Sequence, residues 1–532
     1  MRAGPVALGS VDAVLPTLPA TLRPRSGAAV PLSVLARSTG AVVEPAPGAG
    51  TDPQVRGVTL DSRLVAPGDL YVALPGRRHH GAAFTTAAAA AGAVAVLTDP
   101  AGRPAAAGAG LPVLVLEDPR AVLAEAAAQV YGRPADALTT YGITGTNGKT
   151  TTTFLLDAAL RAAGHRTGTV GTIGFLLDGR PLDAARTTVT TPEAPELQAL
   201  LAHLREEGAD SVVMEVSSHA LVLGRADAIT FDVAAFTTFG RDHLDFHGDE
   251  ESYFEAKAQL FTPARTRRVV LNVDDARGRQ LLERVGATPE LAVRTVSLTG
   301  AGADYAMVSA RVRPDGSTDV VARAGDRELA FTLGLPGDFN IRNALTALAM
   351  VELAGGDVVT AATGLADARV PGRMERVVLG VGAPAVVVDF AHTPQAVAAA
   401  LQALGGRRCV VVLGCGGDRD PDKRADMGAA AAEAAAVVVV TDDNPRSEDP
   451  AAIRAQVLDG ARAVASAAEV LDGGDRRSAI RTALGLAGPE DVVAVLGKGH
   501  ETGQEVRGEV LPFHDADVAR EEWAALHPGA DR

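Results

Sequence analysis

A glycine-rich loop between a short apolar run and a helical pattern is the first feature of this sequence that could do chemistry. Residues 142–152 read Gly-Ile-Thr-Gly-Thr-Asn-Gly-Lys-Thr-Thr-Thr. Glycines let backbone N–H groups approach phosphate oxygens closely, and the N-terminus of a helix favours the same anions. Lys149 is placed to reach the β- and γ-phosphates of a nucleotide, and the Thr150 hydroxyl to hold Mg²⁺. Although Ile143 replaces the first glycine of the general pattern, the segment predicts an ATP site.

Acidic and histidine side chains further along the chain are candidates for a metal site. Glu215 follows the apolar run 212–214, so it would lie at the tip of a strand, where P-loop NTPases place a magnesium-binding acid. Residues 241–245 read Arg-Asp-His-Leu-Asp, and His243 beside two acids suits a divalent ion or a proton relay. Taken alone, these are common surface features, and Lys257 is most simply a solvated helix lysine.

Composition and charge narrow the class of protein. The chain has 532 residues, of which 47% are apolar and 22% charged, so two or three globular domains are expected. A net charge of −15 argues against a nucleic-acid partner. No apolar run of about 20 residues suits a membrane span. Residues 1–30 are rich in Pro, Ala and Gly and do not resemble a signal peptide, which predicts a disordered tail and a cytoplasmic protein.

Alternating apolar runs and helical patterns predict an α/β fold with three domains. Residues 31–136 hold short β-like runs separated by helical or loop segments. Residues 137–369 carry the P-loop and predict a central, P-loop ATPase-like domain with a parallel or mixed sheet. Residues 370–532 predict a Rossmann-like domain with ligands at the carboxyl ends of its strands. Its strand candidates are residues 385–388, 410–413, 436–440 and 492–496.

Six motifs, in this order, closely resemble those of the Mur ligase family. They lie at residues 145–151, 215–219, 241–245, 337–344, 372–376 and 389–394. The resemblance covers nearly all of the chain after residue 57. It implies a uridine-nucleotide substrate on the domain at 31–136, ATP on the domain at 137–369 and the incoming amino acid on the domain at 370–532. A monomer is expected.

The resemblance also implies which residues handle ATP and the metal. Lys149, Glu215, His243 and Lys257 would be catalytic, with the Lys257 amine carbamylated by CO₂. A desolvated lysine loses its charge readily, and its carbamate supplies an anionic oxygen. Mg²⁺ would be held by Thr150, Glu215, His243 and the Lys257 carbamate. The implied ATP-binding residues are Gly145, Thr146, Asn147, Gly148, Lys149, Thr150, Thr151, Asn343, Arg373 and Asp389.

A third set of residues matches the family's contacts to the nucleotide-linked muramoyl dipeptide. Leu223 stands where some members have a glutamine, which would remove one substrate hydrogen bond. The implied contacts are Leu60, Ser62, Arg77, Arg78, His79, Asn147, Thr190, Thr191, Ser217 and Arg225.

The third domain carries a motif typical of the members that add diaminopimelate. Asp443, Asn444, Pro445 and Arg446 follow a strand candidate, and Arg446 could pair bidentately with the distal carboxylate of diaminopimelate, which lysine lacks. An isolated Asn-Pro pair would be an ordinary exposed turn. The other implied contacts to the amino acid are Arg419, Gly497 and Glu501.

The implied reaction joins diaminopimelate to UDP-N-acetylmuramoyl-L-alanyl-D-glutamate in peptidoglycan synthesis, using ATP and an acyl-phosphate intermediate. Two alternatives of the same chemistry are a lysine-adding member and a folylpolyglutamate synthase-like ligase, and Arg446 argues against both. A regulator that binds nucleotide without catalysis is a third, and the intact Lys149, Glu215, His243 and Lys257 argue against it.

Overall fold

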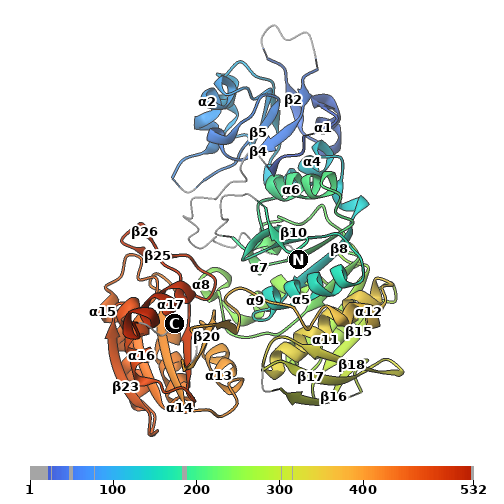
Figure 1. Cartoon of the computed structure of the whole chain (residues 1–532). Helices are drawn as coiled ribbons and strands as arrows, with labels where there is room; N and C mark the ends of the chain where they lie inside the picture. The colour runs from blue at the N-terminus through green and yellow to red at the C-terminus, as the bar shows by residue number, and fades with distance from the viewer. Residues whose placement is uncertain are drawn as a thin grey trace.

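The computed structural model describes residues 22–25, 27–46, 52–76, 78–182, 189–300, 302–313, 316–380 and 382–528. Three α/β units follow one another along the chain, coloured blue, green to yellow, and orange to red in Figure 1. Each unit has its own sheet, which confirms the expected three-domain α/β fold. Among the described helices, none has the length and apolar character needed to cross a membrane.

The N-terminal unit is built on a five-stranded sheet. Its strand order is β2-β7-β6-β5-β4, with β4 to β7 parallel and β2 antiparallel to β7. The strands are β2 Val42–Glu44, β4 Gly57–Thr59, β5 Asp69–Ala73, β6 Ala95–Thr98 and β7 Val113–Val115, and the small pair β1 Val30–Pro31 with β3 Gln54–Val55 lies beside them. The helices are α1 Leu32–Thr39, α2 Thr85–Ala90, α3 Arg103–Ala107 and α4 Pro119–Val130, with short 3₁₀ turns η2 Ser62–Leu64, η3 Gly81–Phe84 and η4 Pro134–Ala137.

The start of the described chain is held in place by specific contacts. Leu22 is buried, and Arg23 Nη1 lies 2.8 Å from Asp69 Oδ1 on β5. The backbone N–H of Arg25 donates to Glu206 Oε2 at 2.7 Å. Residues 22–25, which fall within the expected disordered tail at 1–30, therefore contact the folded part of the protein. Residues 1–21 lie outside the described residues.

The central unit contains an eleven-stranded sheet with the order β11-β10-β9-β12-β8-β13-β14-β15-β16-β17-β18. The seven neighbouring strands β9-β12-β8-β13-β14-β15-β16 are parallel. Antiparallel strands extend the sheet at both ends, β10 and β11 beside β9, and β17 and β18 beside β16. The strands are β8 Thr139–Thr144, β9 Thr167–Gly171, β10 Gly174–Leu177, β11 Arg180–Pro181, β12 Ser211–Glu215, β13 Val233–Phe236, β14 Arg268–Asn272, β15 Ala292–Ser297, β16 Tyr305–Val312, β17 Thr318–Ala324 and β18 Arg327–Leu333.

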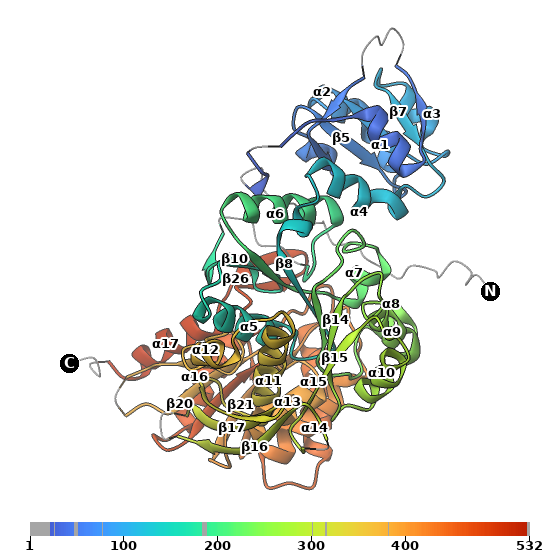
Figure 2. The same cartoon turned by 90° about the vertical axis from the view of Figure 1, so that its right-hand side faces the viewer.

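Helices cover both faces of the central sheet. Helices α5, α11 and α12 share one apolar core with the sheet, and α6 contributes to the core on the other face. Figure 2 shows α6 between the N-terminal unit and the central sheet. The helices are α5 Lys149–Ala162, α6 Ala194–Glu206, α7 Ser218–Val222, α8 Leu244–His247, α9 Glu250–Ala258, α10 Ala276–Gly286, α11 Asp338–Leu353 and α12 Val358–Thr363.

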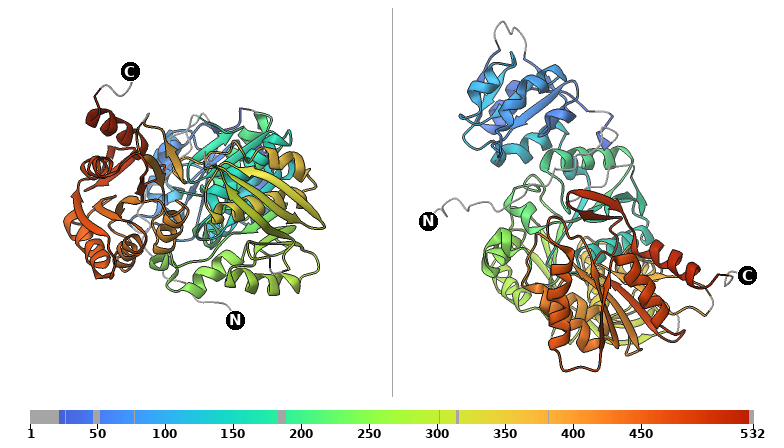
Figure 3. Two further views of the ribbon diagram at one scale, coloured as in Figure 1. Left: turned by 60° about the horizontal axis from the view of Figure 1, so that its bottom comes forward. Right: turned by 90° about the vertical axis from the view of Figure 1, so that its left-hand side faces the viewer.

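The C-terminal unit is a six-stranded sheet with helices on both faces, as Figure 3 shows. The order is β19-β20-β24-β21-β22-β23, parallel except for β19. The strands are β19 Glu375–Val377, β20 Ala385–Asp389, β21 Cys409–Cys415, β22 Val437–Asp442, β23 Glu469–Gly474 and β24 Val492–Leu496, and the hairpin β25 Gly503–Val506 and β26 Glu509–Pro512 is separate. The helices are α13 Pro394–Gln402, α14 Lys423–Ala434, α15 Pro450–Ala463, α16 Arg476–Leu486 and α17 Asp515–Leu526.

Candidate active site

The glycine-rich loop joins the end of β8 to the start of α5. Gly148 caps the helix with φ +90°, and a Cβ on it would lie 2.7 Å from Asn343 Oδ1 on α11. Only glycine suits a position with this φ and this close neighbour. Lys149 Nζ donates to the carbonyl oxygens of Gly145 at 2.9 Å and Thr146 at 3.0 Å. The loop therefore presents backbone N–H groups and the half-buried Lys149 amine at the N-terminus of a helix, an arrangement that suits phosphate.

Glu215 lies at the carboxyl end of β12, as expected, and is 1% exposed. Its Oε2 accepts hydrogen bonds from Thr150 Oγ1 at 2.9 Å and from Thr172 Oγ1 at 3.0 Å. Its Oε1 accepts one from the backbone N–H of Thr172 at 2.9 Å. Sequence reasoning missed Thr172. It follows the buried strand β9, which neighbours β12, so its place at the ligand-bearing edge of the sheet was a usable signal.

Lys257 is buried, at 1% exposure, and is not the solvated helix lysine that the residue suggests by itself. Its Nζ donates to Gly145 O at 2.9 Å and lies 4.3 Å from the centroid of the Tyr253 ring. Burial lowers the pKa of Lys257 well below its usual value, and the nearby positive charge of Lys149 lowers it further, against the opposing effect of Asp242. The side chain is thus suited to be a neutral amine.

His243 belongs to a cluster of rings near α8 and α9. Its Nε2 lies 3.4 Å from Asp242 Oδ2, and its ring centroid lies 4.9 Å from that of His219. Burial lowers the pKa of His243 to about 3, although Asp242 acts in the opposite direction. Within the described chain His243 makes no hydrogen bond to Glu215, and no three His, Cys, Asp or Glu side chains converge as metal ligands.

Several residues predicted to contact the muramoyl dipeptide adjoin Glu215. Thr191 Oγ1 donates to Glu215 O at 2.9 Å and accepts the N–H of Ser217 at 3.1 Å. Thr190 Oγ1 lies 3.1 Å from Thr172 Oγ1. Arg225 Nη1 donates to Thr191 O at 3.0 Å. These contacts join residues that are up to 34 positions apart. The carbonyl oxygen of Asn147 accepts a hydrogen bond from Thr237 Oγ1 at 2.6 Å.

The uridine-side candidates lie apart from this cluster, in loops of the N-terminal unit (Figure 1). Leu60 and Ser62 follow β4, and Arg78 and His79 follow β5. The His79 ring centroid lies 6.5 Å from that of Phe84 in an edge-on arrangement. Arg77 lies outside the described residues.

Arg373 and Asp389 connect the P-loop with the C-terminal unit. Arg373 Nη2 donates to Thr150 Oγ1 at 3.4 Å, and its guanidinium lies 4.4 Å from the centroid of the Phe390 ring. Asp389 Oδ2 accepts the N–H of Met374 at 2.7 Å. Burial raises the pKa of Asp389, while the Arg373 charge opposes that shift.

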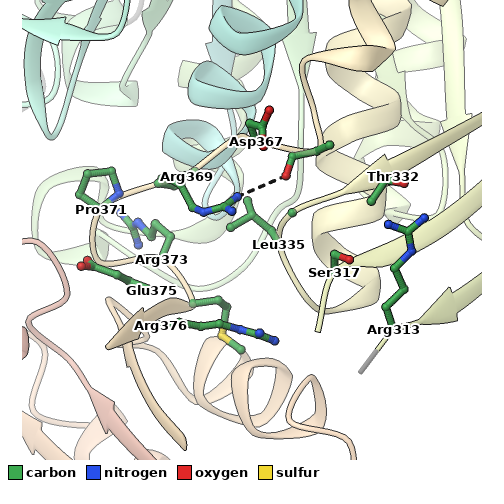
Figure 4. Close-up of a pocket in the computed structure, with 14 residues that line it drawn as sticks. Arg313, Ser317, Thr332, Leu335, Asp367, Arg369, Pro371, Arg373, Glu375 and Arg376 are labelled. Atoms are coloured by element: carbon green, nitrogen blue, oxygen red, sulfur yellow. Dashed lines mark hydrogen bonds between the residues drawn. The ribbon is translucent and has the colours of Figure 1, made fainter. Parts of the chain in front are cut away.

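A cavity of about 540 Å³ opens beside Arg373 (Figure 4). It is formed by the β16–β18 segment of the central unit and by the link to the C-terminal unit. Arg369 in its wall donates to the carbonyl oxygens of Ala366 at 3.3 Å and Ala368 at 2.9 Å. Four lining arginines outnumber two lining acids, which favours an anionic ligand. These residues are Arg313, Arg369, Arg373 and Arg376, with Asp367 and Glu375.

The amino-acid candidates gather at the carboxyl ends of β21, β22 and β24. Asn444 Nδ2 donates to Glu501 Oε2 at 2.8 Å, although these residues are 57 positions apart. Arg446 has φ +52°, its Nη1 donates to Gly417 O at 2.6 Å, and its Nε lies 3.2 Å from Glu505 Oε2 on β25. Asp443, Pro445 and Gly497 belong to the same loops, and Arg419 is exposed in the loop after β21.

Sequence reasoning missed two parts of this cluster. The hairpin β25–β26 lies against the Arg446 loop, with the Arg446 N–H donating to Glu505 O at 3.0 Å. Lys498, inside the motif that supplies Gly497 and Glu501, is fully buried among Asp443, Asn444 and Glu501. Its place in that motif was a signal that could have been used.

A P-loop domain between a small α/β domain and a Rossmann-like domain defines a three-domain ATP-binding enzyme class. Family models match all three parts: "Mur ligase family, catalytic domain" at 54–131, "Mur ligase middle domain" at 143–351, and "Mur ligase, glutamate ligase domain" at 372–499. The chain belongs to the Mur ligase family.

Similar proteins cover nearly the whole chain. The UDP-N-acetylmuramoyl-L-alanyl-D-glutamate–2,6-diaminopimelate ligase of Streptomyces avermitilis is 48% identical over 513 residues, covering 95% of this chain and 98% of that protein. The ligase of the same name from Corynebacterium efficiens is 44% identical over 530 residues, with 97% and 98% covered. A solved structure of a ligase of this name has a TM-score of 0.65 at 31% identity, covering 94% of this chain and 99% of that one.

A more distant likeness concerns the fold alone. A folylpolyglutamate synthase from Mycobacterium tuberculosis has a TM-score of 0.57 at 22% identity, covering 75% of this chain and 94% of that one. It shares the fold, and the likeness carries no information on the substrate.

Proposed function

We propose that this chain is the ATP-dependent ligase that joins 2,6-diaminopimelate to UDP-N-acetylmuramoyl-L-alanyl-D-glutamate in peptidoglycan synthesis. Full-length relatives carry that name at 44–48% identity. The structural observation that carries the proposal is the cluster around Arg446. It combines a cationic side chain with the acids Asp443 and Glu501, and so suits an amino acid that has a carboxylate and an ammonium at its far end.

The amino-acid cluster and the P-loop are joined by a continuous series of contacts. The N–H of Gly497 donates to Asp389 O at 3.0 Å, Asp389 neighbours Arg373, and Arg373 reaches Thr150 at 3.4 Å. A carboxylate activated at the P-loop and an amine held at the C-terminal unit can therefore be brought together within one site.

The reaction that suits this arrangement has two steps. The γ-carboxylate of the D-glutamyl residue attacks the γ-phosphorus of ATP, which gives an acyl phosphate and ADP. Lys149 offsets negative charge on the transferring phosphoryl group. The free amine of diaminopimelate then attacks the acyl carbon, inorganic phosphate leaves, and the amine loses a proton as the amide forms. The protein contributes mainly by holding two anionic reactants and an amino acid close together in the orientation that the reaction needs.

The residues around the P-loop fit a magnesium ion and a lysine carbamate. Thr150 and Glu215 already share a hydrogen bond at 2.9 Å beside the phosphate loop, and a buried, neutral Lys257 amine is the form that reacts with CO₂. Thr150, Glu215, His243 and the carbamate would hold Mg²⁺. When bound, the ion would supply positive charge beside the phosphate oxygens.

The remaining assignments are part of the same proposal. The division into domains is 31–136 for the UDP-linked substrate, 137–369 for ATP and 370–532 for the amino acid. The residues named for each ligand above would act in those roles. We place the enzyme in the cytoplasm, because its reactants are ATP and a nucleotide-linked precursor, and we keep the expectation that it is a monomer.

The proposal is tested by following both products of the reaction. Purified chain is incubated with ATP, Mg²⁺, the UDP-linked dipeptide and diaminopimelate, and ADP and the nucleotide-linked peptide are measured by mass spectrometry. We expect equal amounts of ADP and of a precursor that has gained one diaminopimelate. No ADP release, with or without the two co-substrates, would instead favour a regulator that binds nucleotide without catalysis.

A further inference from the structure

Lys498 lies in the loop after β24, between Gly497 and Glu501, which are both proposed to bind diaminopimelate. Its side chain is 0% exposed. Its Nζ donates to Asn444 Oδ1 at 3.0 Å and to Glu501 Oε2 at 2.9 Å, and it lies 3.6 Å from Asp443 Oδ1. One buried cation thus touches three groups of the amino-acid site that are supplied by two different loops.

Lys498 and the backbone N–H of Glu505 together determine which end of the Asn444 amide faces Glu501. Lysine Nζ and a backbone N–H are donors only. Asn444 Oδ1 accepts from both Lys498 Nζ and the N–H of Glu505, the second at 2.9 Å. The Nδ2 group must then turn to Glu501 Oε2, 2.8 Å away. Without the lysine, one of the two donors that fix this orientation is lost.

Lys498 also leaves one carboxylate oxygen of Glu501 for a ligand. Glu501 Oε2 accepts from both Lys498 and Asn444, whereas Oε1 accepts no hydrogen bond from any residue in the described part of the chain. The nearby Asp443 is a second carboxylate. Two carboxylates therefore lie beside the Lys498 amine, and carboxylates are the groups that bind an ammonium.

Lys498 is not the main anchor of the strand that carries it. Arg476, also buried, donates to Leu496 O at 3.0 Å at the end of β24 and to Asp515 Oδ1 at 2.7 Å. The end of the strand is therefore fixed independently, and the contacts of Lys498 are directed at the amino-acid site.

We propose that Lys498 is a positioning residue for the amino-acid substrate. It orients Asn444 and Glu501 to receive an ammonium group of a diamino acid. This role rests on the proposed function, because it presumes that the cluster around Arg446 binds the incoming amino acid.

The experiment compares the wild-type chain with Lys498→Met and Lys498→Arg. The KM is measured for diaminopimelate, ATP and the UDP-linked dipeptide, and the unfolding temperature is measured with and without diaminopimelate. For Lys498→Met we expect the KM for diaminopimelate to rise about tenfold or more, because two acids lose a buried partner. The KM for ATP should change less than about twofold, and the diaminopimelate-dependent rise in unfolding temperature should disappear.

The arginine variant keeps the charge and tests the same role if the methionine variant does not fold. The charge of the arginine should restore part of the affinity for diaminopimelate. The restoration should be incomplete, because a planar guanidinium cannot reproduce the compact contacts of an ammonium. An unchanged KM for diaminopimelate in a folded variant, or equal increases in the KM for all three substrates, would overturn the role of Lys498. Neither result would overturn the proposed function. A wild-type chain without diaminopimelate-dependent turnover would overturn the proposed function and this role with it.

Discussion

Two lysines at the P-loop donate to the same acceptor, the carbonyl oxygen of Gly145. Lys149 Nζ and Lys257 Nζ each lie 2.9 Å from it. Burial lowers the pKa of both lysines, and the shift is larger for Lys257, whose pKa the charge of Lys149 lowers further, whereas Glu215 raises the pKa of Lys149. The arrangement favours a cationic Lys149, which would bind phosphate, and a neutral Lys257, which could react with CO₂ to form a carbamate.

The carbamate on Lys257 is testable at the scale of one residue. We expect the native mass of the chain in bicarbonate buffer to exceed its mass in CO₂-depleted buffer by the mass of one CO₂. Turnover should fall in CO₂-depleted buffer and recover with bicarbonate. Lys257→Met, which cannot be carbamylated, should be insensitive to CO₂ and slower by about 100-fold or more. A wild-type rate and mass that do not respond to CO₂ would contradict the assignment.

At the scale of elements, the helix α5 and its glycine-rich start are fixed by their neighbours. Gly148 and Gly164 lie at the two ends of this helix with nearly equal positive φ, +90° and +91°. A Cβ on Gly148 would lie 2.7 Å from Asn343 Oδ1, whereas one on Gly164 would have no atom within 4 Å. The two glycines therefore share a backbone requirement and differ only in contact.

This pair gives a matched test of the phosphate loop. Both Gly148→Ala and Gly164→Ala should lose about 1 kcal/mol of stability, because alanine is strained at positive φ. Only Gly148→Ala should raise the KM for ATP, by about tenfold, since the added carbon displaces Asn343 or the loop. Similar KM values for ATP in the two variants would show that the contact with Asn343 is unimportant.

The buried parallel strands were predictable from the sequence, whereas the antiparallel strand β17 and the edge strand β23, which is parallel to β22, were not, for a physical reason. Strands such as β24 are apolar at every position because both faces are covered, and that pattern is plain in a sequence. Strand β17 alternates buried and half-buried residues, and β23 has half-buried or exposed positions throughout, so neither forms a continuous apolar run. Thr172 and Lys498 were missed because their partners, Glu215 and Asn444, are 43 and 54 residues away.

At the scale of the whole molecule, ion pairs join the three units. Arg120 of the N-terminal unit lies 3.1 Å from Glu193 at the start of α6, and Arg241 of the central unit lies 3.2 Å from Asp422 of the C-terminal unit. Helix α6 lies between the first two units (Figure 2). Its Glu196 has a buried Oε2 without a hydrogen-bond partner among the described residues. Burial raises the pKa of Glu196 to about 7.

Glu196 should make stability depend on pH. The folded protein binds this proton more tightly than the unfolded chain, so the contribution of Glu196 to stability is fully present below about pH 4.5 and is lost as the pH rises to about 7. The loss is on the order of 3 kcal/mol. Glu196→Gln should remove this part of the fall, which is measured as the difference in unfolding temperature between pH 5 and pH 8 in both proteins. An identical pH dependence in the two would contradict a buried, protonated Glu196.

The measurement that tests the central claim most directly is phosphate release with ATP, Mg²⁺ and UDP-N-acetylmuramoyl-L-alanyl-D-glutamate, with diaminopimelate or L-lysine as the acceptor. The account predicts turnover with diaminopimelate and at least about tenfold less with lysine, because lysine lacks the carboxylate that Arg446 would bind. Equal or faster turnover with lysine would contradict the role given to Arg446, and no turnover with either would contradict the proposed function.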